Sequence, residues 1–213
     1  MTEASEAPCI YVLAGTNGAG KSSIGGAMFV KKGAEYFNPD EVARRLSSEL
    51  GITQEQANSA AWYEGKRLLE LAIIHRYTFA FETTLGGTTI TALLDDALAS
   101  GIDVRIWYVG LKSPELHIAR VRARVGKGGH DIPETRIRAR FDRSRLNLIR
   151  LLPRLTELRV YDNSREGDPH TGAAPELMLL LHCVRGEIVD CCDLAKTPAW
   201  AKPILAAAMK LRT

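Results

Sequence analysis

The stretch Gly15-Thr16-Asn17-Gly18-Ala19-Gly20-Lys21-Ser22 decides the fold of this chain of 213 residues. Its spacing, G-x-x-x-x-G-K-S, is that of the phosphate-binding P-loop. An apolar run at 10–14 predicts a buried strand before the loop, and residues 22–30 predict a helix after it. Glycines let such a loop curl so that successive backbone N–H groups surround an anion, while the helix adds the positive end of its dipole. We therefore expect Lys21 to contact the β- and γ-phosphates of a nucleotide and Ser22 to bind Mg²⁺.

Composition and charge narrow the class of protein. A hydrophobic content of 46% suits one sizeable core, and a formal net charge of +3 is too small to indicate nucleic-acid binding by itself. The polar, acidic residues 1–8 exclude a signal peptide, and no apolar run is long enough to span a membrane. The cysteines lack the C-x-x-C spacing of a zinc site, so we interpret them as reduced thiols of a cytoplasmic protein. They are Cys9, Cys183, Cys191 and Cys192.

Apolar runs alternate with helical patterns along the chain, which predicts βαβ units. The expected fold class is α/β: a P-loop NTPase fold with a mainly parallel, twisted sheet flanked by helices. Strands are predicted at 10–14, 34–38, 78–81, 104–109 and 158–161, and helices at 22–30, 41–50, 54–75, from the Gly86-Gly87 turn to 99, at 114–125 and at 132–152.

The chain is divided into a core at 1–165, which includes a lid at about 114–152, and a tail at 166–213 that is appended to the core. In the tail, the two apolar runs on either side of Arg185-Gly186 predict a β-hairpin, and residues 198–211 predict a short amphipathic helix.

Two carboxylates are expected at the edge of the sheet where the strands end, which is where ligands bind in open α/β sheets. Glu82 ends an apolar strand and can assist Mg²⁺ or hold a substrate hydroxyl; an ordinary strand-end carboxylate is the alternative. Thr83 and Thr84 can donate hydrogen bonds to the same ligand or simply form the turn. Asp40 ends the second βα turn, where it is either the base that accepts the proton of an attacking hydroxyl or the N-cap of the next helix.

Basic residues gather on two predicted helices joined by the Gly128-Gly129 hinge. At 3.6 residues per turn, Arg120 and Arg124 share one helix face. A face of the second helix carries Arg136, Arg140 and Arg143. We interpret the two helices as a lid over nucleotide phosphates; a solvated basic face or a nucleic-acid surface is the alternative. Aromatic residues that would stack on bases are scarce in this stretch, which makes nucleic acid the weaker interpretation.

Other side chains with possible roles are a histidine and four aromatic residues. His130 follows the hinge, where it either contacts substrate or caps the hinge. The aromatic residues are expected in the core, and they are Trp62, Tyr63, Trp107 and Tyr108.

Several segments taken together resemble the zeta-toxin family of P-loop small-molecule kinases, over roughly residues 9–165. They are A-G-T-N-G-A-G-K-S (14–22), N-P-D (38–40), F-E-T-T-L (81–85), Y-V-G-L (108–111) with S-P-E (113–115), R-x-x-x-R (120–124) and G-G-H-D-I-P-E (128–134). The resemblance implies an ATP- and Mg²⁺-dependent kinase. Family members with known activity phosphorylate a sugar hydroxyl of UDP-N-acetylglucosamine.

The resemblance also implies roles for single residues. Asp40 stands where the family keeps its general base, and Arg124 stands near a phosphate-contacting arginine of the first lid helix. His130 stands where the family toxins carry a second arginine, so Arg136 or Arg140 is expected to take over that contact. The substrate-binding residues are then Glu82, Thr83, Thr84 and His130, and the catalytic residues are Asp40, Lys21, Arg120 and Arg124. The ATP-binding residues are Gly15, Thr16, Asn17, Gly18, Ala19, Gly20, Lys21, Ser22 and Ser23, with Ser22 on the metal.

Three functions remain open at this point. The first is a kinase acting on a hydroxyl of a nucleotide sugar or similar small molecule. The second is a kinase for the 5′-hydroxyl of a polynucleotide, and the third is an ATP-binding module without catalysis. A GTPase is disfavoured because the sequence has no N-K-x-D motif. Few residues precede the first strand, so an antitoxin is expected to be a separate protein.

Overall fold

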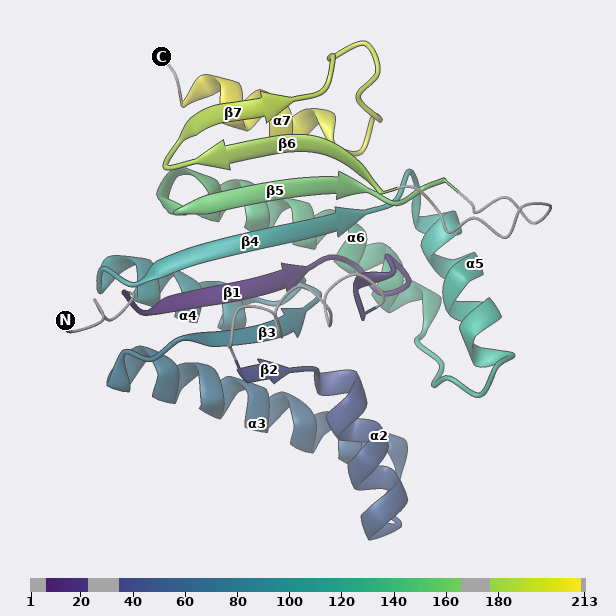
Figure 1. Ribbon diagram of the computed structural model, residues 1–213. Coiled ribbons are helices and arrows are strands. Elements are labelled where there is room, and N and C mark those ends of the chain that lie inside the picture. The colour runs from purple at the N-terminus through teal and green to yellow at the C-terminus, as the bar shows by residue number, and fades with distance from the viewer. Residues whose placement is uncertain (1–6, 23–34, 166–176, 212–213) are drawn as a thin grey trace.

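The computed structural model describes residues 7–22, 35–165 and 177–211, and within them seven strands form one sheet (Figure 1). The strand order is β2-β3-β1-β4-β5-β6-β7. The strands are β1 (Cys9–Ala14), β2 (Glu35–Phe37), β3 (Phe79–Thr83), β4 (Asp103–Gly110), β5 (Glu157–Asp162), β6 (Met178–Val184) and β7 (Glu187–Cys191). The first five pair in parallel, and β6 and β7 pair antiparallel. The expected α/β fold with a mainly parallel sheet is therefore confirmed.

The strand that precedes the phosphate loop lies in the middle of the sheet. β1 pairs with β3 on one side and with β4 on the other, so the chain winds away from β1 in two directions. At such a switch point the connections after neighbouring strands separate and leave a crevice at the carboxyl edge. The order of the strands thus places the end of β1, and the loop that follows it, at the expected ligand site.

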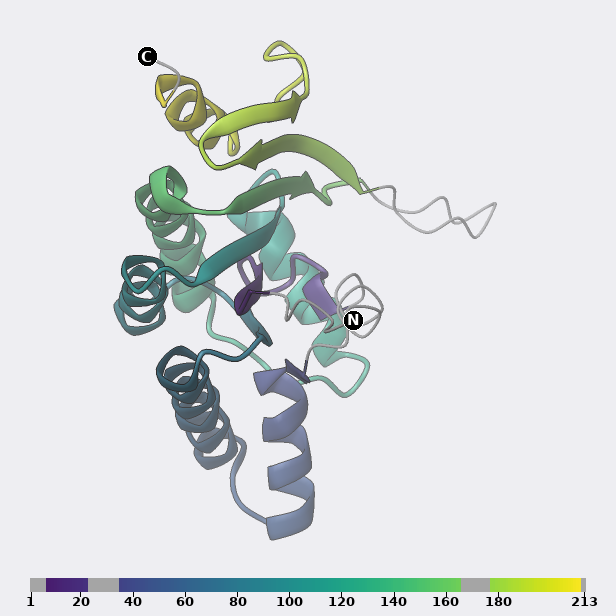
Figure 2. The same cartoon turned by 60° about the vertical axis from the view of Figure 1, so that its left-hand side comes forward.

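Within the described residues, most of the helices lie along one face of the sheet. Figures 1 and 2 show α3, α4, α6 and α7 along that face, whereas α5 stands at the edge where the parallel strands end. The helices are α2 (Pro39–Leu50), α3 (Gln54–His75), α4 (Thr88–Ala99), α5 (Pro114–Val125), α6 (Glu134–Leu151) and α7 (Lys202–Lys210), with the short 3₁₀ helix η1 (Leu152–Arg154) after α6. Most of the helix expected at 22–30 lies outside the described residues, as do residues 166–176 at the start of the predicted tail.

Local sequence explains where the helices near the site begin. Ser113 caps α5 by accepting a hydrogen bond from the backbone N–H of Leu116, and Pro114 occupies the first turn. The N-cap of α2 is Asn38, whose side chain accepts from the backbone N–H groups of Asp40 and Glu41. The interpretation of Asp40 as the N-cap is therefore wrong, and α2 begins two residues earlier than predicted because Pro39 is a suitable first residue.

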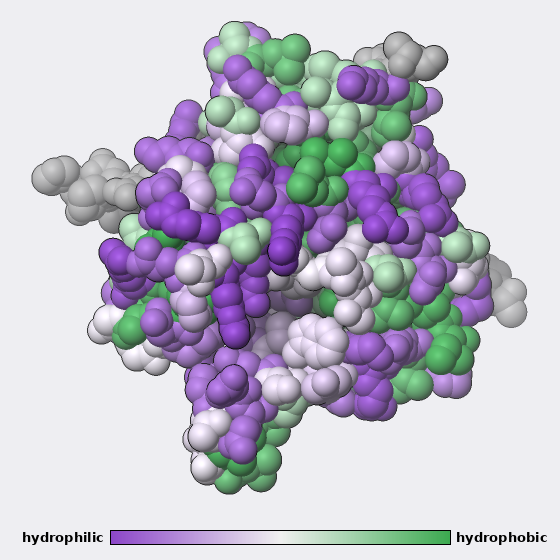
Figure 3. Space-filling view, turned by 180° about the vertical axis from the view of Figure 1, so that it is seen from behind, coloured by the Kyte–Doolittle hydropathy of each residue, from purple (hydrophilic) through white to green (hydrophobic). Residues whose placement is uncertain are grey.

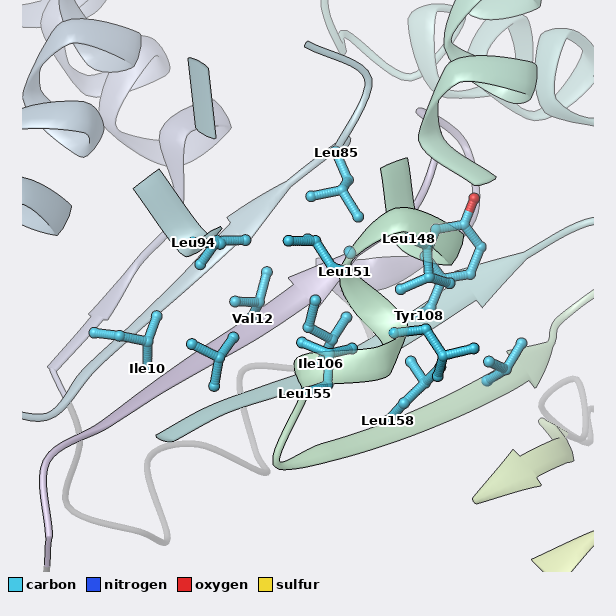
Figure 4. Packing of buried hydrophobic residues seen from close by; sticks show 14 of the residues in the cluster. Ile10, Val12, Leu85, Leu94, Ile106, Tyr108, Leu148, Leu151, Leu155 and Leu158 are labelled. Atoms are coloured by element: carbon cyan, nitrogen blue, oxygen red, sulfur yellow. The ribbon is translucent and has the colours of Figure 1, made fainter. Parts of the chain in front are cut away.

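The main core fills the space between the sheet and its helices (Figure 4). Ile10 and Val12 of β1 point to this side, where Leu94 of α4 and Leu148 of α6 pack against the sheet. The alternate residues of β1 point to the opposite side, where Tyr11 stacks on the Trp107 ring with 5.9 Å between centroids. Side chains of a strand alternate between the two faces of the sheet, and in β1 both sets are buried.

The prediction that four aromatic residues lie in the core is correct for two of them. Trp107 and Tyr108 are buried, but Trp62 is 42% exposed and Tyr63 is 63% exposed. The reason lies in the spacing of the buried row of α3, which omits both positions. That row consists of Ala57, Ala61, Gly65, Leu69 and Ala72.

The C-terminal residues continue the same sheet and the same core. The hairpin of β6 and β7 turns at Arg185 and Gly186, both in the left-handed region, as the hairpin prediction required. The Trp200 indole Nε1–H donates to Asp162 Oδ1 at 3.0 Å, and the ring packs in the main core. α7 begins at Lys202, four residues later than predicted. In the described part of the chain no helix is long and apolar enough to cross a membrane.

Gly110 at the end of β4 gives a stability test of this packing. A Cβ atom at Gly110 would lie 2.4 Å from the Trp200 ring, which the Asp162 hydrogen bond keeps from moving. Gly110→Ala should lower the free energy of unfolding by about 1–3 kcal/mol through overpacking. The control is Gly126→Ala, because a Cβ there meets nothing closer than 3.6 Å. Urea denaturation that gives equal stabilities for the two variants would contradict the tight contact.

Candidate active site

The phosphate loop leaves β1 through a glycine that no other residue can replace. Gly15 has φ +144°, and a Cβ atom there would lie 2.1 Å from the Val109 backbone oxygen in β4. The Gly15 N–H donates to the Thr83 backbone oxygen at 3.2 Å, which ties the start of the loop to the end of β3. The loop therefore begins pressed between the two strands that flank β1.

Two buried side chains, neither of which sequence reasoning singled out, hold the outside of the loop. Asn163, just after β5, donates from Nδ2 to the Ala19 backbone oxygen at 2.8 Å. His117 on α5 lies with Nδ1 2.8 Å from the Asn17 backbone oxygen. Because a carbonyl oxygen only accepts, the Nδ1 atom carries the hydrogen. Burial, with smaller effects from the charges of Lys21 and Arg120, lowers the pKa of His117 to about 4, so the ring is neutral at pH 7.

The end of the loop carries the lysine and serine of the motif. Lys21 Nζ donates to the Gly15 backbone oxygen at 2.8 Å, so the ammonium group bends back over the loop. Burial lowers the pKa of Lys21, although the nearby Glu82 and Asp40 carboxylates oppose this shift. Ser22 Oγ donates to Glu82 Oε2 at 3.2 Å. Ser23, the last predicted ATP-binding residue, lies outside the described residues.

Glu82 lies inside β3 and is buried, with a relative exposure of 6%. Besides Ser22, its carboxylate accepts hydrogen bonds from the Tyr36 hydroxyl and from Asn38 Nδ2, the latter at 3.3 Å. Burial and the negative charge of Glu82 raise the pKa of Tyr36, which keeps the phenol protonated as a donor. Three donors thus fix one carboxylate at the carboxyl edge of the sheet.

The Ser22 and Glu82 oxygens suit Mg²⁺ better than they suit a metal ion that takes all of its ligands from protein side chains. Within the described residues no group of three or more His, Cys, Asp or Glu side chains is arranged to hold a metal. Mg²⁺ takes oxygen ligands, and it commonly uses one or two protein groups together with waters and substrate phosphates. A hydroxyl and a carboxylate in direct contact beside a phosphate loop match that requirement.

Asp40 lies in the first turn of α2 with its carboxylate directed to the lid. Its Oδ2 atom is 3.6 Å from Arg124 Nη1, and both side chains are 38% exposed. Arg124 also donates from Nη2 to the His130 backbone oxygen at 3.3 Å. Its Nε atom is buried and has no hydrogen-bond partner in the described parts of the chain. The guanidinium group of the first lid helix therefore spans the hinge and the candidate base, with one donor unused.

A cavity of about 450 Å³ lies beside these groups, between α2, α3, α6 and the end of β3. Figure 3 shows the hollow from behind, bordered by hydrophilic side chains. Predicted site residues that line it are Asn17, Asp40, Glu82, Thr83, Thr84, His130, Arg136 and Arg140. Arg120 does not line it; this arginine donates to the Arg165 backbone oxygen at 3.2 Å.

The cavity also has lining residues that the sequence analysis did not assign to a site. These are Asn58, Trp62 and Lys66 of α3. Arg143, from the predicted basic face of α6, lines the cavity as well. The signal that could have identified Trp62 is its absence from the apolar row of α3.

Burial lowers the pKa of His130, and burial followed by the charge of Arg136 lowers the pKa of Arg140.

One family model matches most of the chain. Residues 1–168 match the family model described as "Zeta toxin". The chain is 31% identical over 133 residues to an uncharacterized protein of Haemophilus influenzae, a match that covers 60% of this chain and 88% of that protein.

Two solved structures share the fold. The crystal structure of AvrRxo1-ORF1 with AvrRxo1-ORF2 and ATP has a TM-score of 0.65 and 17% identity, over 95% of this chain and 64% of that one. The chain thus spans less than two thirds of that relative's length. The PezAT toxin–antitoxin system of Streptococcus pneumoniae has a TM-score of 0.61 and 14% identity, over 98% of this chain and 87% of that one. At these identities the likeness is one of fold.

The low pKa of His117 gives a test by pH. Between its native pKa of about 4 and the ordinary value of 6.5, the unfolded chain binds more protons than the native protein. Stability from this group is therefore complete above pH 7 and is lost as the pH falls from 6.5 towards 4. Between pH 7 and pH 5 the loss should be about 2 kcal/mol.

His117→Phe removes the titrating ring, so its free energy of unfolding should depend less steeply on pH over this range. Urea denaturation of both proteins at pH 7 and pH 5 measures the difference, and the carboxylates common to both proteins cancel. Parallel pH dependences would contradict the buried, neutral histidine.

Proposed function

Because the chain belongs to the zeta toxin family, we propose that it is an ATP- and Mg²⁺-dependent kinase that phosphorylates a hydroxyl of a small molecule. The acceptor we favour is a nucleotide sugar such as UDP-N-acetylglucosamine. One observation carries the proposal: Asn17 of the phosphate loop and Asp40, a carboxylate that is not the N-cap of its helix, line the same cavity. That arrangement supports transfer of a phosphoryl group from a nucleotide on the loop to an alcohol in the cavity.

On the donor side, the residues of the loop would hold the phosphates of ATP. Lys21 would exchange its contact with the Gly15 oxygen for the β- and γ-phosphates, while Ser22 and Glu82 would hold Mg²⁺. When bound, the metal neutralises charge on the phosphates. The position of Arg124 beside the proposed base supports a role for this arginine in binding the transferring group. Its guanidinium is already within reach of Asp40, beside which the γ-phosphate would lie.

On the acceptor side, Asp40 would serve as the general base. The hydroxyl oxygen of the acceptor forms a bond to the γ-phosphorus as the bond from that phosphorus to the ADP oxygen breaks. Asp40 takes the hydroxyl proton, and ADP leaves with the bonding electrons. The protein needs to supply little covalent chemistry for this reaction, so positioning and charge carry most of the catalysis. Thr83, Thr84 and His130 border the cavity where they would orient the acceptor.

The remaining cavity wall supports an acceptor with both a planar ring and negative charge. Trp62 offers an exposed aromatic side chain, and Lys66, Arg136 and Arg143 bring positive charge to the same cavity. Rings stack on indole, and guanidinium groups bind phosphate oxygens. A nucleotide sugar carries both a base and a diphosphate, so its two parts match the two kinds of lining residue.

A polynucleotide is the alternative acceptor. The arginines of α5 and α6 could bind its phosphates, but two of them are already paired with carboxylates. Arg138 forms an ion pair with Glu115 at 2.7 Å, and Arg122 pairs with Glu134. Pairing with carboxylates reduces the positive field that a phosphate backbone would meet. Steep loss of acceptor binding with added salt would favour the polynucleotide; a shallow dependence favours the small molecule.

A separate antitoxin protein is proposed as the partner. The PezAT relative is described as a toxin–antitoxin system, and AvrRxo1-ORF1 was crystallised with AvrRxo1-ORF2. The family membership of this chain supports a partner of the same kind.

The proposed base is tested by Asp40→Asn. This variant should keep ATP binding and lose turnover by about 100-fold or more, the range of general-base catalysis. Lys21→Ala should lose both. The control is Glu41→Gln, which neutralises the neighbouring carboxylate in the same helical turn and should keep full activity. The measurement is transfer of label from radiolabelled ATP to a panel of nucleotide sugars and oligonucleotides. Full activity of Asp40→Asn would rule out its role as base.

The acceptor site is tested by Trp62→Ala. Loss of the stacking surface should raise KM for the acceptor about tenfold and leave KM for ATP unchanged. Ile74→Ala is the control, because Ile74 is an exposed apolar residue of the same helix that does not line the cavity, whereas Tyr63 packs edge to face on the Trp62 ring. Equal steady-state constants for the two variants would place the acceptor elsewhere.

A further inference from the structure

His117 is a buried polar residue on the first lid helix for which phosphoryl transfer, as described above, has no use. It is 1% exposed, and its sequence position is 100 residues away from that of its partner, Asn17. The contact is to the backbone of the phosphate loop, not to another side chain. The imidazole thus contacts a peptide group of the loop, and peptide N–H groups are what a P-loop uses to bind phosphate.

The hydrogen bond from His117 fixes the orientation of one peptide group. In a trans peptide the C=O and the following N–H point in opposite directions. With the Asn17 oxygen held towards α5, the N–H of Gly18 is turned away from α5. The helix backbone adds to this constraint, because a Cβ at Gly18 would lie 2.6 Å from the His117 backbone oxygen. Helix and loop are therefore in contact through both the imidazole and the backbone of one residue.

The second lid helix contacts the same loop residue. Arg140 on α6 donates from Nη1 to Asn17 Oδ1 at 2.7 Å. The next residue, Phe141, meets the His117 ring edge to face, with 5.7 Å between centroids. Asn17 is therefore bound by α5 through its backbone oxygen and by α6 through its side-chain oxygen. Both helices of the lid rest on one residue of the phosphate loop.

We propose that His117 is a positioning residue for nucleotide binding: its Nδ1–H orients the Asn17–Gly18 peptide group and couples the lid to the phosphate loop. This inference rests on the proposed function, since it assigns the histidine to the ATP end of the same site. It differs from that proposal in what it predicts, because the effect is on nucleotide binding and does not involve the acceptor.

The alternative is that His117 only fills space between α5 and α6. Two substitutions separate the possibilities because each keeps what the other removes. His117→Asn retains an N–H donor near the position of Nδ1 and loses the ring. His117→Phe retains a ring against Phe141 and loses the donor, which leaves the Asn17 oxygen buried without its partner.

The experiment measures binding of a non-hydrolysable ATP analogue by isothermal titration calorimetry, with thermal unfolding of each variant alongside. His117→Phe should weaken binding about tenfold or more, whereas His117→Asn should stay within about threefold of the wild type. His75→Phe, an exposed histidine at the end of α3, controls for the substitution itself.

Each outcome decides the matter. Weaker binding by the Phe variant than by the Asn variant supports the positioning role, whatever the order of their melting temperatures. Equal binding, or weaker binding by the Asn variant, overturns it and leaves the proposed kinase intact. Absence of analogue binding to the wild-type protein overturns the proposed function together with this inference.

Discussion

A phosphate loop can turn its N–H groups inward only if something else satisfies its carbonyl oxygens on the outside. In this protein two such partners come from distant parts of the chain: His117 for the Asn17 oxygen and Asn163 for the Ala19 oxygen. Lys21, within the motif, donates to the Gly15 oxygen. Unpaired carbonyl groups in a buried loop would cost free energy comparable to lost hydrogen bonds. The G-x-x-x-x-G-K-S motif therefore depends on a frame that the motif itself does not contain.

The sheet order supplies that frame. With β1 between β3 and β4, the loop emerges where the end of β3 brings Glu82 and the end of β2 leads to Asp40. β5 lies beyond β4, and its last residues bring Asn163 back to the loop. Side chains from four strand ends thus meet at one edge, although they are spread over most of the chain. α5 stands at the edge where the strands end, and α6 runs along the face that the other helices cover (Figure 1).

The features that could be predicted from the sequence are those with a local cause. Helix starts at Ser113-Pro114, the strand before the loop and the carboxylate at the end of β3 each follow from a few neighbouring residues. The roles of His117 and Asn163 could not be predicted, because their partners lie 100 and 144 residues away. Asp40 shows the limit of local reasoning. A neighbouring asparagine is the better cap, and no spacing rule decides between two adjacent candidates.

The tail reaches the edge of the sheet that carries the phosphate loop through a short chain of contacts: Trp200 binds Asp162, and the next residue, Asn163, supports the loop. Translation proceeds from the N-terminus, so the complete motif is synthesised before Asp162, Asn163 and Trp200. A nascent chain that ends before residue 200 contains every residue of the phosphate loop. It lacks Trp200, whose hydrogen bond holds Asp162 next to the supporting Asn163. The order of synthesis thus places completion of these contacts to the loop after residue 200 has been made.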